Sequence, residues 1–382
     1  MTEWRKRCLG EITSFMSKGI PPKYVERENE NTVRVLNQKC NRNFEIKYEE
    51  SRLHDCSKKK VPADKMLQPG DVLINSTGTG TAGRVAQLYE VPTPTTIDGH
   101  MILLRPTEEI DSIYYGYAVK AFQPKIETLA EGSTGQTEIN RKRLQEEIVI
   151  SFPKEKETQE RIARFLLNID EKIKVNDKIN KNLEQQVSVL YQSWFEDFEI
   201  TNGVCPENWS YQELSTIADI ASGKRPPVKS DTCNEKTPIS IVGAASVMGF
   251  TSEANHTDKI LVTGRVGTHG VIQRFNTTCW TSDNTLVITS PYYEFTNQIL
   301  HRIDYASMNR GSTQPLITQG DMKKVAVLVP DEDTLAKFEE FAGSLMAKWE
   351  ANNNENVKLA SLRDTLLPKL MSGELDVSDI DL

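Results

Sequence analysis

Three glycines in the first third of the chain have the spacing of a phosphate-binding turn. Gly78, Gly80 and Gly83 form a GxGxxG pattern directly after the strand-like run DVLINST. A dinucleotide site needs a helix next, because the helix N-terminus faces the pyrophosphate. The following residues, RVAQLYEVPTPTT, are β-rich and then proline-rich, and Arg84 and Val85 stand where a P-loop needs Lys and Ser/Thr. We therefore expect a turn between two strands and keep a nucleotide-binding oxidoreductase as the alternative.

The other reactive side chains form no recognisable catalytic constellation. The 5 histidines make no HExxH motif, GxSxG is absent, and no carboxylate pair stands out. The 6 cysteines are scattered without a CxxC pair, which favours reduced thiols in a cytosol; zinc on Cys56 and His54 is the alternative. We therefore expect no catalytic residue, metal or cofactor in this chain.

No segment has the apolar length needed to cross a bilayer, and the N-terminus lacks the apolar core of a signal peptide. These features favour a cytoplasmic protein without membrane association.

Basic residues gather at a few places in the predicted β regions, where they could contact DNA. Arg and Lys neutralise phosphates, and Arg can also read purine edges in the major groove. The candidates are Lys58, Lys59, Lys60, Arg84, Arg141, Arg143, Lys224, Arg225, Lys229, Arg265 and Arg310, with Arg274 in the same second set. Ordinary solvated charge is the alternative for each cluster.

The net charge of −8 argues at first against a nucleic-acid partner. However, residues 331–382 carry 5 Lys/Arg against 12 Asp/Glu, whereas residues 1–152 and 204–330 are nearly balanced. The acidity is therefore concentrated away from the candidate DNA-contacting residues.

The chain repeats one design twice. The set Trp4, Leu9, Ile12, Pro21 and Pro22 recurs 205 residues later as Trp209, Leu214, Ile217, Pro226 and Pro227. In the middle of each half, TTIDGHMILLRP (95–106) parallels WTSDNTLVITSP (280–291). The separation shrinks along the chain, so we expect insertions in the first half, in a loop around residues 51–60.

Each half begins with short β-branched runs broken by Gly, Pro and Asn turns, and ends in a long helical segment (158–198 and 334–371). Both helical segments carry residues at alternating separations of three and four. The seam residues are Ile162, Leu166, Ile169, Ile173, Asn176, Asn180, Leu183, Val187, Leu190 and Trp194 in the first, and Phe338, Ala342, Leu345, Trp349, Asn352, Asn356, Leu359, Leu366 and Leu370 in the second, interrupted by Arg363.

A repeat of this kind buries its apolar residues by pairing with another helix, and polar residues in the seam restrict register. The two asparagine pairs stand at equivalent places, so an antiparallel pairing would set them opposite each other. The alternative is that each helix packs only on its own domain. Two matched segments, each ~60 Å long if continuous, favour a mutual coiled coil.

Four segments of the chain resemble one known family. ETQERIARFLLNIDEKIKVNDKINKNLEQQVSVLYQSWFEDFE (157–199) is similar to the central spacer region of Type I restriction–modification specificity subunits, and LRDTLLPKLMSGELDV (362–377) is similar to their C-terminal ending. The stretches 4–12 and 206–227 resemble the two domain starts of that family. The second spacer, DEDTLAKFEEFAGSL, lacks the QERIA phrase (159–163) of the first.

The resemblance implies an α+β protein with a pseudo-twofold internal repeat. It predicts target recognition domains over residues 1–153 and 201–330, a central spacer helix over 154–200, a C-terminal spacer helix over 331–375, and an acidic tail over 376–382. The helices would pair as an antiparallel coiled coil. Each recognition domain would read one half of an asymmetric bipartite DNA site.

The implied partners are double-stranded DNA, two modification subunits that bind S-adenosylmethionine and methylate adenine, and restriction subunits that use ATP and Mg²⁺. The chain itself would be non-catalytic and would serve defence against foreign DNA. A coiled-coil adaptor without a DNA role is the second alternative.

Overall fold

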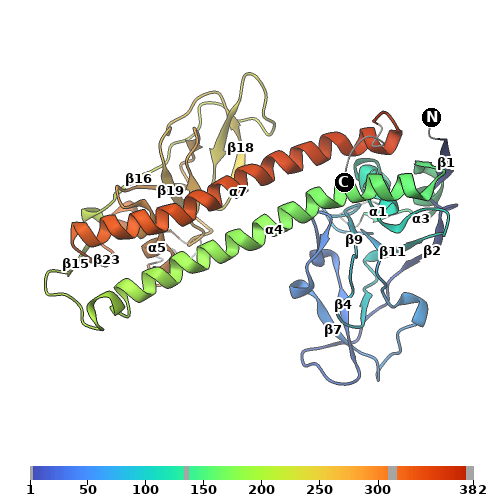
Figure 1. The fold of residues 1–382 in the computed structure, drawn as a ribbon, viewed down its shortest axis with the longest axis horizontal. Coiled ribbons are helices and arrows are strands. Elements are labelled where there is room, and N and C mark those ends of the chain that lie inside the picture. The colour runs from blue at the N-terminus through green and yellow to red at the C-terminus, as the bar shows by residue number, and fades with distance from the viewer. Residues whose placement is uncertain (1–2, 133–136, 309–315, 376–382) are drawn as a thin grey trace. The chain divides into compact units, whose positions relative to one another are not determined.

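Two units, each built around its own β-sheets, make up the chain in the computed structural model, which describes residues 3–132, 137–308 and 316–375. Unit 1 comprises Met1–Val175 and Glu355–Leu382, and unit 2 comprises Asn176–Asn354. The helices α4 (Lys156–Phe195) and α7 (Glu332–Ser372) each pass from one unit into the other (Figure 1).

In unit 1, a four-stranded antiparallel sheet has the order β2-β11-β8-β9, and a second sheet has the order β10-β4-β7-β3. The strands of the first sheet are β2 (Thr13–Lys18), β11 (Met101–Pro106), β8 (Val72–Asn75) and β9 (Val85–Gln87), and those of the second are β10 (Thr95–Ile97), β4 (Thr32–Leu36), β7 (Arg52–Asp55) and β3 (Tyr24–Val25). All residues of β8 are buried. A continuous apolar run fits this central strand because both of its faces are covered.

The remaining elements of unit 1 complete its core. The first strand pairs antiparallel with the strand that precedes α4, which brings the start and the end of the β domain together. The two strands of that pair are β1 (Trp4–Cys8) and β14 (Val149–Pro153). Two further short pairs are β5 (Asn41–Arg42) with β6 (Glu45–Ile46) and β12 (Ala130–Glu131) with β13 (Glu138–Ile139). The helices are α1 (Ser112–Ala121), α2 (Gln123–Glu127) and α3 (Arg141–Glu147).

Unit 2 repeats this topology. Its four-stranded sheet has the order β16-β22-β19-β20, its three-stranded sheet has the order β18-β17-β21, and β15 pairs with β23 as β1 does with β14. The bounds are β15 (Ser210–Glu213), β16 (Asp219–Ser222), β17 (Ile239–Val242), β18 (Val247–Thr251), β19 (Ile260–Gly264), β20 (Gln273–Phe275), β21 (Trp280–Thr281), β22 (Thr285–Thr289), β23 (Ala326–Val329), α5 (Tyr293–Arg302) and α6 (Gln319–Lys323). The predicted α+β class with two mainly β halves is confirmed.

One glycine in each unit shows how closely the two copies match. A Cβ on Gly19 would lie 2.1 Å from the Asp98 carbonyl oxygen, and a Cβ on Gly223 would lie 2.1 Å from the Ser282 carbonyl oxygen. Both glycines follow the first strand of their four-stranded sheet, where it crosses a neighbouring strand. Only a residue without a side chain allows this approach, so the repeat extends to the backbone packing.

The extra residues of the first half lie on both sides of a strand at the expected place. Residues 52–55 form β7, which pairs with β4 and β3, so they are a strand and not a loop. The longer connections flank this strand: residues 37–51 separate β4 from β7, whereas residues 243–246 separate β17 from β18 in unit 2. After β7, residues 56–71 lead to β8, whereas residues 252–259 lead from β18 to β19 in unit 2. The sequence indicated extra chain near this place but not that a strand divides it.

Candidate nucleic-acid interface

The glycine motif lies in a β-hairpin. β8 and β9 pair antiparallel on either side of it, and Gly78, Gly80 and Gly83 all have positive φ. Gly267 and Gly270, also with positive φ, stand in the corresponding turn between β19 and β20. No helix follows either turn, so neither presents a helix N-terminus to a pyrophosphate. The prediction of a turn between strands is confirmed, and the motif gives no support to an oxidoreductase.

Equivalent backbone positions at these turns carry different side chains. Ser76 donates its N–H to the His100 carbonyl and accepts a bond from the Ile139 N–H at 2.7 Å. In unit 2, Arg265 donates its N–H to the Asn284 carbonyl and accepts from the Ile317 N–H at 3.0 Å. The backbone is thus held in the same way, while a hydroxyl in one unit is replaced by a guanidinium in the other. Arg265 is half-buried, and its Nε has no hydrogen-bond partner within the described ranges.

The predicted basic residues of unit 1 occupy three separate places. Lys58, Lys59 and Lys60 are exposed after β7, and Lys58 Nζ lies 3.5 Å from an Asp55 carboxylate oxygen. Arg84 is half-buried and donates to the Gly80 carbonyl oxygen within the glycine turn. Within the described residues, no hydrogen bond or ion pair joins these two sets.

The third place is α3, where Arg141 and Arg143 differ in environment. Arg141 is exposed at the first turn. The Arg143 guanidinium contacts Glu131 at 2.8 Å and Glu147 at 2.5 Å, and these hydrogen bonds raise the pKa of Arg143. Two carboxylates already hold Arg143, so Arg141 is the better placed of the two for a phosphate.

In unit 2, Lys224, Arg225 and Lys229 are exposed on the segment after β16. The backbone of Lys224 is fixed, since its carbonyl accepts from Trp280 Nε1 at 2.7 Å. Arg310 lies outside the described residues.

The inclusion of Arg274 among the accessible basic residues was wrong. Its side chain is 10% exposed and forms two hydrogen bonds with the Glu294 carboxylate, the shorter at 2.6 Å. A guanidinium held in this bidentate manner is a structural element of unit 2.

His54 also has a structural role. The ring is fully buried; its Nδ1 accepts from the Lys23 N–H at 2.8 Å, and its Nε2 lies 2.7 Å from the Lys59 carbonyl oxygen. Since the backbone occupies both ring nitrogens, His54 does not offer a free nitrogen to zinc beside Cys56. Within residues 3–132, 137–308 and 316–375, no cluster of three or more His, Cys, Asp or Glu side chains could hold a metal ion.

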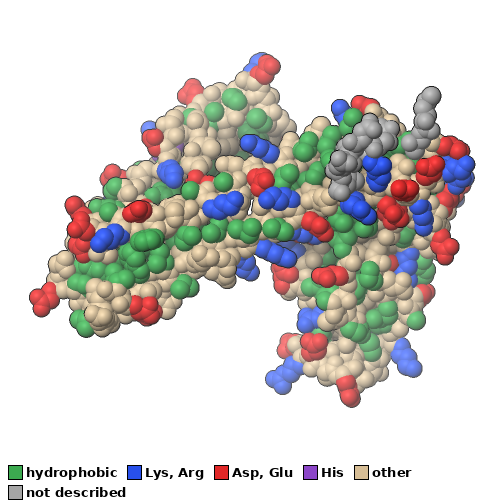
Figure 2. All heavy atoms as spheres, in the orientation of Figure 1, with side chains coloured by type: hydrophobic (Ala, Val, Ile, Leu, Met, Phe, Trp, Pro, Cys, Tyr) green, Lys and Arg blue, Asp and Glu red, His purple; other side chains and the backbone are tan. Residues whose placement is uncertain are grey.

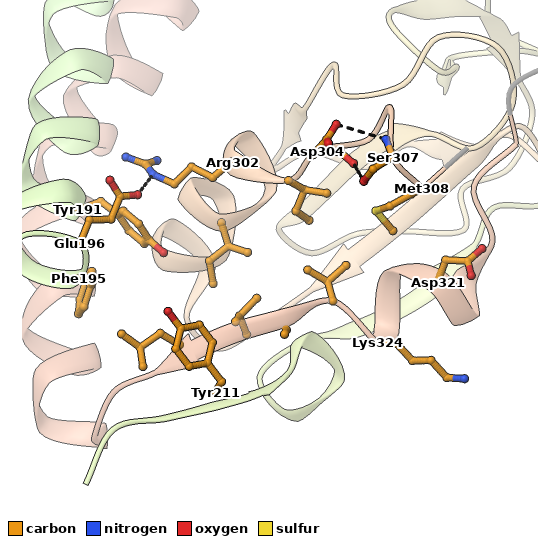
Figure 3. A pocket seen from close by; sticks show the side chains of 16 residues that line it. Tyr191, Phe195, Glu196, Tyr211, Arg302, Asp304, Ser307, Met308, Asp321 and Lys324 are labelled. Atoms are coloured by element: carbon orange, nitrogen blue, oxygen red, sulfur yellow. Dashed lines mark hydrogen bonds and ion pairs between the residues drawn. The ribbon is translucent and has the colours of Figure 1, made fainter. Parts of the chain in front are cut away.

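Unit 2 contains a hollow of about 740 Å³ between the end of α4, α5 and strand β23 (Figure 3). Tyr191 and Phe195 of α4 form one wall and Val327 lies in another. Arg302 Nε donates to Glu196 at 2.6 Å, and its guanidinium carbon lies 4.2 Å from the centre of the Tyr191 ring. Of the charged residues that line the hollow, Arg302 and Glu196 pair with each other, whereas Asp304 accepts from neighbouring backbone N–H groups and Asp321 from Thr318.

The polar seam of the two long helices is visible in unit 2. Asn352 Nδ2 donates to Asn180 Oδ1 at 2.8 Å, and Asn180 Nδ2 donates to Asn353 Oδ1 at 2.9 Å. One turn further along, Trp349 Nε1 donates to a Glu184 carboxylate oxygen at 2.8 Å. Residue numbers rise along α4 as they fall along α7, so the helices pair antiparallel (Figure 1).

The two helices also contact each other in unit 1. Arg363 Nη1 of α7 lies 2.5 Å from Asp170 Oδ1 of α4. The second oxygen of Asp170 accepts from the Tyr117 hydroxyl at 2.6 Å. Arg363, which interrupts the apolar seam in the sequence, is therefore part of a polar network that also reaches α1.

Every predicted seam residue of both helices is buried or half-buried. Figure 2 shows apolar side chains between charged ones at the surface of α4. Val175, Ile179 and Val189 of this helix are exposed. In the described part of the chain, no helix is long and apolar enough to traverse a bilayer.

Comparison with known proteins shows which proteins this chain is similar to. Residues 1–185 match the family model for the Type I restriction modification DNA specificity domain. The chain is 25% identical to the Type I restriction enzyme MjaIX specificity subunit of Methanocaldococcus jannaschii, over 70% of this chain and 69% of that protein. Residues 1–185 are thus similar to a Type I specificity domain, and the chain as a whole is similar to Type I specificity subunits.

A second member of the Type I specificity subunit family matches over nearly the full length. The HindI specificity subunit of Haemophilus influenzae is 20% identical, with 98% of this chain and 100% of that protein covered. The crystal structure of a Type I system S subunit from M. genitalium has 19% identity and a TM-score of 0.58, covering 97% of this chain and 96% of that one. This similarity shows a shared fold.

Sequence reasoning missed the Asp170–Tyr117 contact and the hollow. Asp170 stands one residue away from the seam position Ile169, so its spacing gave no signal. The interruption of the seam by Arg363 was the available clue, because a buried guanidinium requires an acidic partner.

Proposed function

We propose that this chain is the non-catalytic DNA-reading subunit of a Type I restriction–modification complex. Its β domains, residues 1–153 and 201–330, each read one half of a bipartite site. The observation that carries this proposal is that the two domains share a strand order while equivalent turns differ in side chains, as at Ser76 and Arg265. Two readers with different side chains recognise different half-sites, so the whole site is asymmetric.

The helices α4 and α7 set the distance between the half-sites in this proposal. A helix of 40 residues is ~60 Å long, enough to span half-sites about one DNA turn, ~34 Å, apart. The exposed apolar side chains of α4 offer a surface to two modification subunits.

In the proposed complex, the modification subunits use S-adenosylmethionine to methylate adenine. The restriction subunits use ATP and Mg²⁺ to move along and cleave DNA. This chain holds neither cofactor and acts with these partners in the cytoplasm, in defence against foreign DNA.

The test is single-molecule methylome sequencing of a host with and without this gene, alongside an active modification partner. Loss of one bipartite adenine-methylation motif supports the proposal. Unchanged methylation contradicts it, and a perfectly palindromic motif contradicts the asymmetric reading. Gel shifts with the purified methylating complex separate a DNA reader from a coiled-coil adaptor.

A point variant sharpens this test. Arg265→Ala should relax the motif in one half only, because an arginine that reads a base contributes about 1–3 kcal/mol of discrimination at that base. Lys348→Gln, an exposed change on α7, is the matched control and should leave the motif intact.

A further inference from the structure

The ion pair between Asp170 and Arg363 lies where an apolar contact would otherwise be expected. The two side chains are 11% and 16% exposed, and the nitrogen and oxygen are 2.5 Å apart. Around them lie the apolar seam residues Ile169 and Leu366. Charges taken this far out of water carry a desolvation cost that a close partner only partly repays. Stability alone therefore does not explain why the pair is there.

The second copy of the seam shows the alternative. A shift of 176 residues, which relates the two seams, takes Asp170 to Met346 and Arg363 back to Val187. Met346 and Val187 are both buried in the apolar core of unit 2. Met346 precedes Trp349 by three residues, and Val187 follows Glu184 by three residues. Trp349 and Glu184 are hydrogen-bonded across the helix pair. The equivalent place in unit 2 is thus closed by two apolar side chains.

This difference bears on which helices can pair. Because the seams of α4 and α7 match at most positions, α4 could pair with α4 of a second copy, and α7 with α7. In an α4–α4 pair of the same register, Asp170 would face Val187 of the other copy. In an α7–α7 pair, Arg363 would face Met346. Each of these pairings separates Asp170 from Arg363 and leaves Asp170 with the Tyr117 hydroxyl and Arg363 with the exposed Asp364, whereas the α4–α7 pairing joins the two buried charges.

We propose that the Asp170–Arg363 pair is a partner-selecting device, which makes α4 choose α7 of its own chain over the identical helix of a second copy. Polar residues in helix seams are known to restrict partner and register at a cost in stability. The hydrogen bond from Tyr117 holds Asp170 in place from α1, and Arg363 is also bonded to its neighbour Asp364 at 2.8 Å. If the proposed function holds, the device also keeps the recognised DNA site asymmetric.

The test compares self-association of full-length variants. Equal amounts of two copies with different affinity tags are refolded together from urea, captured through one tag and probed for the other, with masses checked by light scattering. The wild type should carry almost no second tag. The double variant Asp170→Met with Arg363→Val, which gives unit 1 the seam of unit 2, should carry about tenfold more, because it removes the charges that oppose homotypic pairing.

Asp170→Asn with Arg363→Gln keeps a polar side chain at both positions and removes both charges, and should give a smaller increase. If both double variants fold and stay as strictly single-chain as the wild type, the proposal is overturned. The single variants Asp170→Met and Arg363→Val should lower the urea midpoint, and the Met/Val double variant should recover it. If the Met/Val double variant instead loses as much in urea midpoint as the two single variants lose together, the pair serves stability. That result would also overturn the proposal.

The readout involves no DNA. A negative result in the self-association assay would therefore not contradict the proposed function. A negative result in the methylation test would likewise not contradict this inference about helix pairing.

Discussion

Trp4 packs directly on the backbone of Gly373, at the point where α7 has ended. A Cβ on Gly373 would lie 2.7 Å from Trp4 Cε2, and the glycine has a φ of +79°. The start of the first β domain is therefore fastened to the end of the last helix. Unit 2 has an equivalent arrangement, in which Trp209 contacts Phe195 at the end of α4, with 5.7 Å between ring centres.

Replacing Gly373 with Ala should destabilise unit 1 for two reasons. A left-handed conformation costs a non-glycine residue about 1–3 kcal/mol, and the new methyl group meets the Trp4 ring. Gly203→Ala is the control, because Gly203 also has a φ of +79° but would place its Cβ in open space. Urea unfolding should show a larger loss for Gly373→Ala; equal losses would mean that the Trp4 contact contributes nothing.

The asparagine bond across the seam predicts non-additive stability. Asn352→Ala removes the donor to a buried amide oxygen of Asn180, which should cost about 1–3 kcal/mol of unfolding free energy. Replacing Asn180 and Asn352 together with Ala should cost less than Asn180→Ala and Asn352→Ala summed, because the hydrogen bond between the two side chains is then lost only once. Chemical denaturation of all four proteins measures the coupling, and simple additivity would contradict the prediction.

Glu339 of α7 predicts a pH dependence of stability in unit 2. Its carboxylate accepts the backbone N–H groups of Glu294 and Phe295 at the start of α5, and burial raises its pKa to about 7. Since the folded state holds the proton more tightly than the unfolded state, this stabilisation is full at acidic pH, below the unfolded pKa. It is lost as the pH rises through about 7.

Glu339→Gln stays neutral and should gain Tm relative to the wild type as the pH is raised from about 5 to about 8.5. Glu340→Gln, at the exposed neighbouring position, should leave the pH profile of Tm unchanged. A Tm difference for Glu339→Gln that does not vary with pH would contradict the assignment.

The two arginines of α3 predict different effects on DNA binding. Arg141→Gln should reduce the slope of log K against log salt by about one unit if Arg141 neutralises one phosphate. Arg143→Gln should leave that slope nearly unchanged, because Glu131 and Glu147 already hold Arg143. Binding of the methylating complex to its target over a range of salt concentrations measures both. A larger effect of Arg143 would reverse the assignment.

Patterns that repeat along the sequence were the most informative part of it. The second glycine turn shows that Gly78–Gly83 need not bind phosphate. The matched asparagine pairs predicted that asparagines face each other in an antiparallel pairing, and Asn352 does bond to Asn180. Contacts without a periodic signal were not predictable. Nothing near Arg274 in the sequence indicates that Glu294 of α5 pairs with it, and Asp170 stands just beside the seam. Such contacts depend on how distant segments meet in the folded chain.

The two units also differ in whether they are formed by one segment of the chain or by two. Unit 2 is one continuous stretch, whereas unit 1 needs residues from Glu355 onward to join residues made at the beginning of synthesis. Until then, Ile162 and Leu166 lack Leu367 and Leu370, which share their core. Because domains fold as units while the chain emerges from the ribosome, unit 2 can finish first. The half of the protein that is translated first is therefore the last to be completed, and its apolar helix face stays open throughout that interval.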